Sequence, residues 1–186
     1  MKFIKIIISL LISFNTSLVA NSNDDLQNIL NEGGKLIFIR HAYAPGAGDP
    51  NNFDISNCAS QRNLNKEGIE QAKNIGKFFL NNHIDRNIVL SSEWCRCEQT
   101  AKYAFKNYKN KSFLNSFYSQ KFTRNKANQI KELKEYIKKW NGKNNIIFVT
   151  HYVVILEILN VSVSSGEIVV ADKELNILIR QQTSNI

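Results

Sequence analysis

The apolar positions of the chain form two patterns, unbroken runs and helical spacing, which together predict a sheet covered by helices. Unbroken apolar runs of strand length occur at 36–39, 88–90 and 146–149. Such runs are typical of strands that are buried on both faces, as in a parallel sheet. Around them, apolar positions recur at helical spacing and predict helices in five segments: 24–31, 66–80, 97–108, 130–140 and 152–160.

The remaining segments complete an α/β arrangement. Two apolar stretches at 167–171 and 175–179 are joined by the polar residues 172–174, which predicts a C-terminal hairpin. A long loop over 42–63 holds both prolines, and 113–118 fits either a short strand or a loop. We therefore predict one α/β domain over 21–186, a three-layer sandwich with a mostly parallel central sheet and helices on both faces.

The first twenty residues have the layout of a secretory signal peptide. Lys2 and Lys5 flank the start of an apolar run, and small or polar residues lead to Ala20. The run of about 12 residues is shorter than the roughly 20 that span a bilayer, so cleavage is favoured over a membrane anchor. We expect a signal peptide over 1–20, export to the periplasm, and no stable membrane span after cleavage.

Composition and charge narrow the function classes. The chain has 186 residues, 43% of them hydrophobic, and a formal net charge of +8. This supports one globular domain. The lysines of 130–140 are mixed with glutamates, as on a solvated helix face, and no basic helix is interleaved with exposed aromatic residues. We therefore expect no nucleic-acid partner.

Cationic side chains follow each of the three buried runs. Arg40 and His41 come directly after the first, Arg96 soon after the second, and His151 directly after the third. In open α/β sheets, ligands bind beyond the carboxyl ends of the strands. Two guanidinium groups in one pocket repel each other unless an anion joins them, and arginine suits phosphate oxygens. Singly, these residues could be structural histidines or ion-paired arginines, but their convergence predicts a phosphoryl site.

Four ordered motifs resemble those of the histidine phosphatase superfamily, in its phosphoglycerate mutase-like branch one. The likeness covers roughly 33–159, and the loop at 44–50 and the cysteine segments are similar to those of exported members. The motifs are the Arg-His-Gly/Ala signature at 36–42, the Leu-Ser/Thr-x-x-Gly-x-x-Gln-Ala helix start at 64–72, the Ser-Ser-x-x-x-Arg-x-x-Gln-Thr-Ala segment at 91–101, and the strand that delivers the second histidine at 148–151.

The resemblance implies a metal-independent phosphatase of the histidine acid phosphatase type, with no cofactor. His41 would attack phosphorus and become phosphohistidine, while Arg40, Arg96 and His151 would bind the peripheral oxygens. One ring nitrogen of His41 must be unprotonated for attack, so the other should donate to a backbone carbonyl or a similar acceptor. We also expect the helix that starts near Glu93 to direct backbone amides at the phosphate.

The general acid is open at this point. In many branch-one relatives a glutamate protonates the leaving group, but Ser116 stands at the corresponding position here. Glu93, which is close to Arg96, and Asp49, in the long loop, are the two candidates. If neither serves, substrates with good leaving groups, such as phosphoramidates, are favoured.

Export allows the three cysteines to form a disulfide. We expect Cys58 to pair with Cys95 or with Cys97, which would pin the long loop to the second catalytic segment. No cluster of histidine, cysteine and aspartate has zinc spacing, so we predict no metal site.

The leading hypothesis is therefore hydrolysis of a phosphomonoester, either a small molecule or an envelope phosphate. The alternative is a catalytically weak or inactive module of the same fold that binds or senses phosphate. The missing glutamate favours this alternative, whereas the intact pair of His41 and His151 opposes it.

Overall fold

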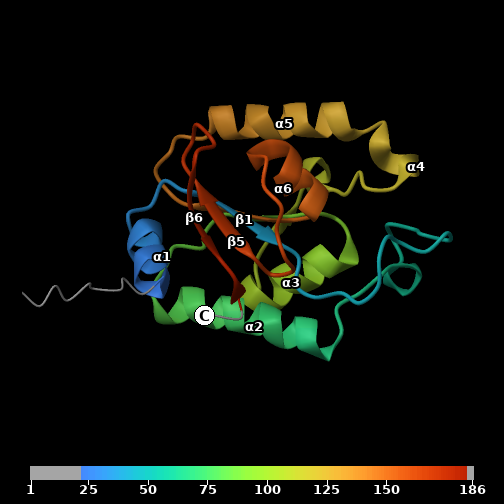
Figure 1. The fold of residues 1–186 in the computed structure, drawn as a ribbon, viewed down its shortest axis with the longest axis horizontal. Coiled ribbons are helices and arrows are strands. Elements are labelled where there is room, and N and C mark those ends of the chain that lie inside the picture. The colour runs from blue at the N-terminus through green and yellow to red at the C-terminus, as the bar shows by residue number, and fades with distance from the viewer. Residues whose placement is uncertain (1–21, 184–186) are drawn as a thin grey trace, which may run out of the picture.

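The computed structural model describes residues 22–183, which form a sheet between two layers of helices (Figure 1). The six strands lie in the order β3-β2-β4-β1-β5-β6. The strands from β3 to β1 are parallel, and β5 and β6 add an antiparallel hairpin at the other edge. Their bounds are Leu36–Arg40 for β1, Val89–Ser91 for β2, Lys109–Asn110 for β3, Ile146–Thr150 for β4, Ile168–Ala171 for β5 and Ile177–Gln181 for β6.

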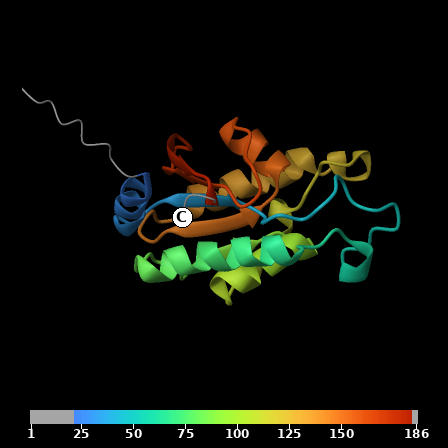
Figure 2. The same cartoon turned by 60° about the horizontal axis from the view of Figure 1, so that its bottom comes forward.

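The helices cover both faces of the sheet. Figure 2 shows α2 and α3 on one side and α5 and α6 on the other. This confirms the predicted α/β sandwich with a mostly parallel sheet. The helices are α1 (Ser22–Asn31), α2 (Lys66–Asn81), α3 (Cys95–Phe105), α4 (Gln120–Thr123), α5 (Lys126–Lys139) and α6 (Tyr152–Leu159), with short 3-10 turns η1 (Cys58–Ser60) and η2 (Ser112–Leu114).

Successive side chains of the central strands point to opposite faces of the sheet, which divides the core into two layers. In β1, Leu36 and Phe38 pack with α5 and α6, whereas Ile37 and Ile39 pack with α2 and α3. All four side chains are fully buried. Burying an aliphatic or aromatic side chain of this size stabilises a fold by about 1.5–3 kcal/mol, so both faces of β1 hold the layers together. This is why its apolar run is unbroken.

The strand order places three chain segments at one edge of the sheet. β4 lies between β2 and β1, and Arg40 pairs in register with Thr150 while Ser91 pairs with Val149. Because these strands are parallel, their carboxyl ends all point to the same edge. The residues that follow β1, β2 and β4 therefore meet there.

A close approach of two backbones fixes α2 beside this edge. The side chain of Asn65 caps the helix by accepting a hydrogen bond from the amide of Gly68 at 2.9 Å. A Cβ atom at Gly68 would lie 1.9 Å from the carbonyl oxygen of Tyr43, two residues after His41. Only glycine permits this contact, so the helix lies directly against the segment that follows β1.

The predicted and observed elements differ mainly in short segments. The stretch at 113–118, for which the sequence fits either a strand or a loop, overlaps η2 and has no strand. The brief β3 and α4 were not predicted. β6 begins at Ile177 because Asp172 accepts hydrogen bonds from the backbone and side chain of Asn176, which lengthens the turn. The predicted signal peptide over 1–20 lies outside the described residues. Within 22–183, no helix has the length and apolar character needed to cross a membrane.

Candidate active site

The residues that follow β1, β2 and β4 surround a cavity of about 250 Å³. The sequence-predicted Arg40, His41, Arg96 and His151 all line it, together with Asp49. The structure thus brings together the four cationic residues that lie far apart in the chain. Glu93 is not among the residues that line the cavity.

His41 is held as a neutral imidazole with one unprotonated nitrogen. Its backbone amide donates to the carbonyl of Thr150 at 2.9 Å, and its Nδ1 lies 2.9 Å from the carbonyl oxygen of Ala42. A carbonyl only accepts, so Nδ1 carries the proton and Nε2 presents its lone pair. Burial, followed by the positive charge of Arg96, lowers the pKa of His41 well below its ordinary value. The carbonyl of Ala42 is thus the backbone acceptor that we expected for one ring nitrogen of His41.

His151 takes the opposite tautomer. Its Nδ1 lies 3.3 Å from Nη2 of Arg96, which can only donate, so the proton sits on Nε2. That nitrogen lies 2.9 Å from Oγ of Ser92, whose hydroxyl donates to Asn115. Burial and then Arg96 lower the pKa of His151 well below its ordinary value. Both histidines are therefore neutral near pH 7.

The guanidinium group of Arg96 connects the whole site. Its Nε donates to Nε2 of His41 at 3.2 Å, and its Nη1 donates to Oδ1 of Asp49 at 2.6 Å. Nη2 contacts the other Asp49 oxygen at 3.4 Å and His151 at 3.3 Å. The Arg96 side chain is 3% exposed and that of Asp49 10%. These contacts use four of the five N–H groups of a guanidinium.

Arg40 lines the same cavity and has one buried donor without a partner among the described residues. Its Nη1 donates to the carbonyl of Val163 at 2.7 Å, and its guanidinium lies 5.7 Å from the centre of the Tyr152 ring. Its Nε is buried and has no hydrogen-bond partner within the described part of the chain. Burial and repulsion from Arg96 lower the pKa of Arg40. An oxyanion in the cavity would relieve that repulsion.

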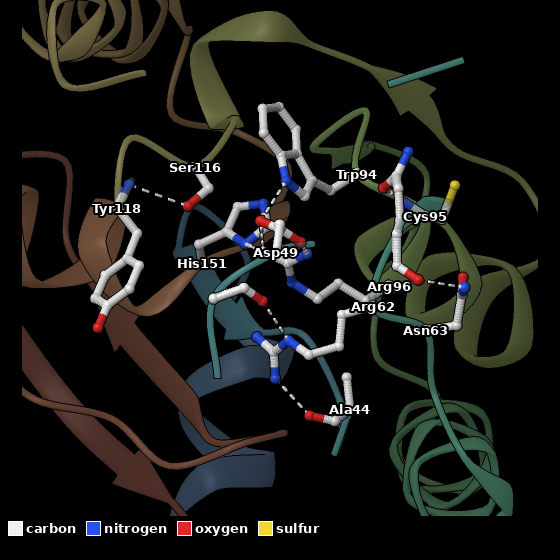
Figure 3. Close-up of polar contacts among 12 residues, drawn as sticks. Ala44, Asp49, Arg62, Asn63, Trp94, Cys95, Arg96, Ser116, Tyr118 and His151 are labelled. Atoms are coloured by element: carbon white, nitrogen blue, oxygen red, sulfur yellow. Dashed lines mark hydrogen bonds and ion pairs between the residues drawn. The ribbon is translucent and has the colours of Figure 1, made fainter. Parts of the chain in front are cut away.

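The two candidate acids occupy different places. Asp49 lies inside the cavity beside Arg96 and also accepts a hydrogen bond from Nε1 of Trp94 at 3.1 Å (Figure 3). The carboxylate of Glu93 instead accepts from the side-chain amide of Asn115 at 2.6 Å. Glu93 thereby orients Asn115, which in turn accepts from Ser92. Ser116, which replaces the expected glutamate, does line the cavity.

Three amides at the start of α3 are bound by side chains of the protein and are not directed at the cavity. The amide of Glu93 donates to the side chain of Asn115 at 2.9 Å, and that of Trp94 donates to Ser92 at 3.2 Å. The amide of Cys95 donates to the side chain of Gln61 at 3.0 Å. Buried amides need partners, and here polar side chains supply them. Anion binding therefore falls to the arginine and histidine side chains.

A disulfide joins the long loop to α3. Of the two pairings considered for Cys58, the structure has the bond to Cys95, with 5.7 Å between the Cα atoms. Cys97 is a free thiol whose sulfur lies 3.4 Å from Nε2 of His151, and burial raises its pKa to about 12. It is therefore a protonated thiol and a poor nucleophile. Glu98 lies near the bonded pair, but disulfide sulfurs offer no thiolate ligands for a metal ion.

Arg62 is a third arginine of the cavity that the sequence argument missed. Its Nη1 donates to the carbonyl of Ala44 at 2.5 Å (Figure 3) and to that of Gly46 at 2.8 Å, and its Nε donates to that of Gly48 at 2.9 Å. Because Arg62 follows no strand, strand-end reasoning could not place it. The available signal was its position in the same long loop as Asp49, between two cavity segments.

Comparisons with known proteins agree with this geometry. A model of the histidine phosphatase superfamily (branch 1) matches residues 36–116. The protein histidine phosphatase SixA complexed with tungstate is similar in structure, with a TM-score of 0.56 and 15% identity over 81% of this chain and 98% of that one. The phosphoglycerate mutase of Thermus thermophilus gives a TM-score of 0.57 and 14% identity over 80% and 98%. No curated protein matches the sequence.

The structural likenesses show a common fold, whereas the family model matches the segment that carries Arg40, His41 and Arg96. His151 lies beyond the matched segment but meets these residues in the cavity. Together, the sequence match over 36–116 and the shared fold make this chain similar to branch 1 of the histidine phosphatase superfamily.

Proposed function

We propose that the chain is a metal-independent phosphatase that hydrolyses a phosphomonoester through a phosphohistidine on His41. The state of His41 carries the proposal: a buried, neutral ring whose Nδ1 is held by Ala42 and whose Nε2 keeps an unprotonated lone pair, which accepts from Arg96 until a phosphoryl group takes its place. Arg40 and Arg96 provide positive charge beside that nitrogen. These are the features that phosphoryl transfer to histidine needs.

The reaction has two balanced steps. The lone pair on Nε2 of His41 forms the P–N bond as the ester P–O bond breaks, and the leaving oxygen takes up a proton. Water then attacks phosphorus and returns a proton to the group that protonated the leaving oxygen, while the P–N bond breaks and inorganic phosphate is released, which restores His41. In both steps, Arg40 and Arg96 stabilise the charge on the peripheral oxygens.

Asp49 competes with the substrate for Arg96. With Asp49 in place, Arg96 has a single N–H left, so a phosphoryl group must displace the carboxylate to gain a paired contact. The displaced carboxyl group stays in the cavity beside the leaving oxygen. We therefore assign it the role of general acid, in preference to Glu93, which is held by Asn115 outside the cavity.

A phosphate-binding or sensing module is the second candidate. Ser116 stands where the glutamate of many relatives would be, and the Asp49–Arg96 pair already fills the anion position. Such a module would bind phosphate without turnover. It would also form no phosphohistidine when exposed to a reactive phosphate donor.

Nucleophile replacement tests the proposed function. We expect the protein to hydrolyse p-nitrophenyl phosphate in excess EDTA, and His41→Ala to lower the rate by at least about 1000-fold because no other group can form the intermediate. After brief exposure to a labelled acyl phosphate, a rapid alkaline quench should preserve and detect base-stable phosphohistidine. His83→Asn, at an exposed histidine, is the control. Activity that survives His41→Ala, or that EDTA abolishes, contradicts the mechanism; binding without turnover or phosphohistidine supports the sensing module.

Asp49→Asn separates the two roles assigned to the carboxylate. Without the competing charge, inorganic phosphate should bind about tenfold more tightly in calorimetry. Hydrolysis of an alkyl phosphate should fall about 100-fold, whereas p-nitrophenyl phosphate, with its better leaving group, should be affected far less. Asp54→Asn removes the same charge from an exposed position in the same loop and should change neither quantity. An equal loss for both substrates would rule out the role of Asp49 as the acid.

The neutral histidines make stability depend on pH. The pKa values of His41 and His151 are lowered in the folded protein, so below the unfolded value of about 6.5 the unfolded chain binds more protons. The free energy of unfolding should therefore fall as pH drops from 6.5, by up to about 1.4 kcal/mol per pH unit for each histidine. Urea unfolding from pH 7.5 to 5.5 measures this slope. His151→Gln should reduce the slope by about half and His83→Asn should retain it; an unchanged slope in His151→Gln would refute the assignment.

Export to the periplasm forms part of the proposal. The Cys58–Cys95 disulfide supports it, since such bonds persist in oxidising compartments. Expressed in a Gram-negative host, the full chain should appear in the periplasmic fraction with Asn21 as its N-terminal residue, measured by mass spectrometry. Replacing the apolar run over 3–14 with polar residues should retain an uncut protein in the cytoplasm. Uncut protein from the unaltered chain would count against the signal peptide.

A further inference from the structure

Arg62 lies in the cavity without a carboxylate partner. Its guanidinium is fixed by three backbone carbonyls, those of Ala44, Gly46 and Gly48. Only Nε and Nη1 make these hydrogen bonds; among the described residues, none accepts from Nη2. Carbonyls are uncharged acceptors, so they hold the side chain in place but leave its positive charge uncompensated.

The surrounding charges show that Arg62 adds to what one phosphoryl group needs. The cavity contains Arg40, Arg62 and Arg96, and the only carboxylate among its lining residues, Asp49, is paired with Arg96. Burial and repulsion from Arg96 lower the pKa of Arg62. A phosphoryl group placed for attack by His41 would be held by Arg40 and Arg96. In the proposed mechanism the displaced Asp49, whose charge also acts on Arg62, serves as the proton donor, so Arg62 would remain without a lasting anionic partner.

The cavity has room for a substrate beyond the phosphoryl group. Arg62 reaches it from the loop after β1, while Tyr118, which is 66% exposed, lines it from the segment after η2 (Figure 3). The loop carbonyls hold the Arg62 guanidinium before any ligand arrives, so little conformational freedom is lost on binding. This is the arrangement of a built anion subsite rather than of a mobile surface arginine.

We infer that Arg62 forms a second anion-binding subsite, so that preferred substrates carry another anionic group a few bonds from the transferred phosphoryl group. The second group is a phosphate or a carboxylate, each of which matches the free edge of a guanidinium. The inference rests on the proposed phosphatase function, because that function assigns the first phosphoryl group to His41, Arg40 and Arg96.

Phosphonate binding tests the subsite independently of turnover. Phosphonates have a P–C bond that phosphoryl transfer to histidine does not break, so the intact protein can be titrated by calorimetry. Propylphosphonate carries one anionic group, propane-1,3-bisphosphonate carries two, and 3-phosphonopropionate replaces the second by a carboxylate. We expect at least one of the doubly anionic ligands to bind about tenfold more tightly than propylphosphonate.

Two variants assign that preference to Arg62. Arg62→Gln should reduce the affinity ratio to about one; a purely structural role in the loop would weaken all three ligands equally and leave the ratio unchanged. Arg86→Gln removes the same charge just before β2, at the opposite edge of the sheet, and should retain the ratio. This control corrects for the general attraction of anions to a basic protein.

The outcomes separate the subsite from the proposed function. Equal binding of all three ligands, or a preference that survives Arg62→Gln, overturns the subsite even if p-nitrophenyl phosphate is hydrolysed. A preference that depends on Arg62, in a protein that hydrolyses no phosphate ester, supports the subsite and overturns the phosphatase. The comparison of the two doubly anionic ligands identifies the preferred second group.

Discussion

The contacts of one buried guanidinium group, that of Arg96, hold the site together. Burying an unpaired charge costs several kcal/mol, so the fold must give Arg96 acceptors whenever the cavity lacks substrate. His41 and His151 each offer a ring nitrogen, and Asp49 offers a carboxylate. Because Arg96 only donates, its contacts leave the nitrogen that it meets on each histidine without a proton. The tautomer of the nucleophile is thus linked to the ion pair that the substrate has to replace.

The position of Arg96 depends in turn on how α3 begins. The disulfide from Cys58 holds the preceding residue, Cys95, and the side chain of Gln61 accepts from the Cys95 amide. Both contacts come from the long loop that also carries Asp49. A displacement of that loop would therefore shift Arg96 and its counterion together. The sheet therefore fixes the positions of the strand ends, and the loop fixes the positions of Arg96 and Asp49 relative to them.

The sequence predicts the buried strands and helices better than it predicts the hydrogen-bond partners of the site residues. Apolar runs such as 36–39 and 146–149 identify the buried strands because packing on both faces leaves a strong local pattern. His41 and His151 follow from the parallel strand order. Arg62 could not be placed in this way, since its partners are carbonyls 14 to 18 residues away in an irregular loop. The partners of the Glu93 and Cys95 amides could not be predicted for a similar reason, because the side chains that accept from them are distant in the sequence.

The charge balance gives Asp49 a double role that neither the family motifs nor the sheet order specifies. The three cavity arginines favour neutral histidines, which prepares His41 for attack, but they also repel one another in the empty site. Asp49 reduces that repulsion as the counterion of Arg96. In the proposed mechanism, an incoming phosphoryl group takes over this task and releases the carboxyl group beside the leaving oxygen. Substrate binding and the placement of the acid would then be parts of one exchange of anions on Arg96.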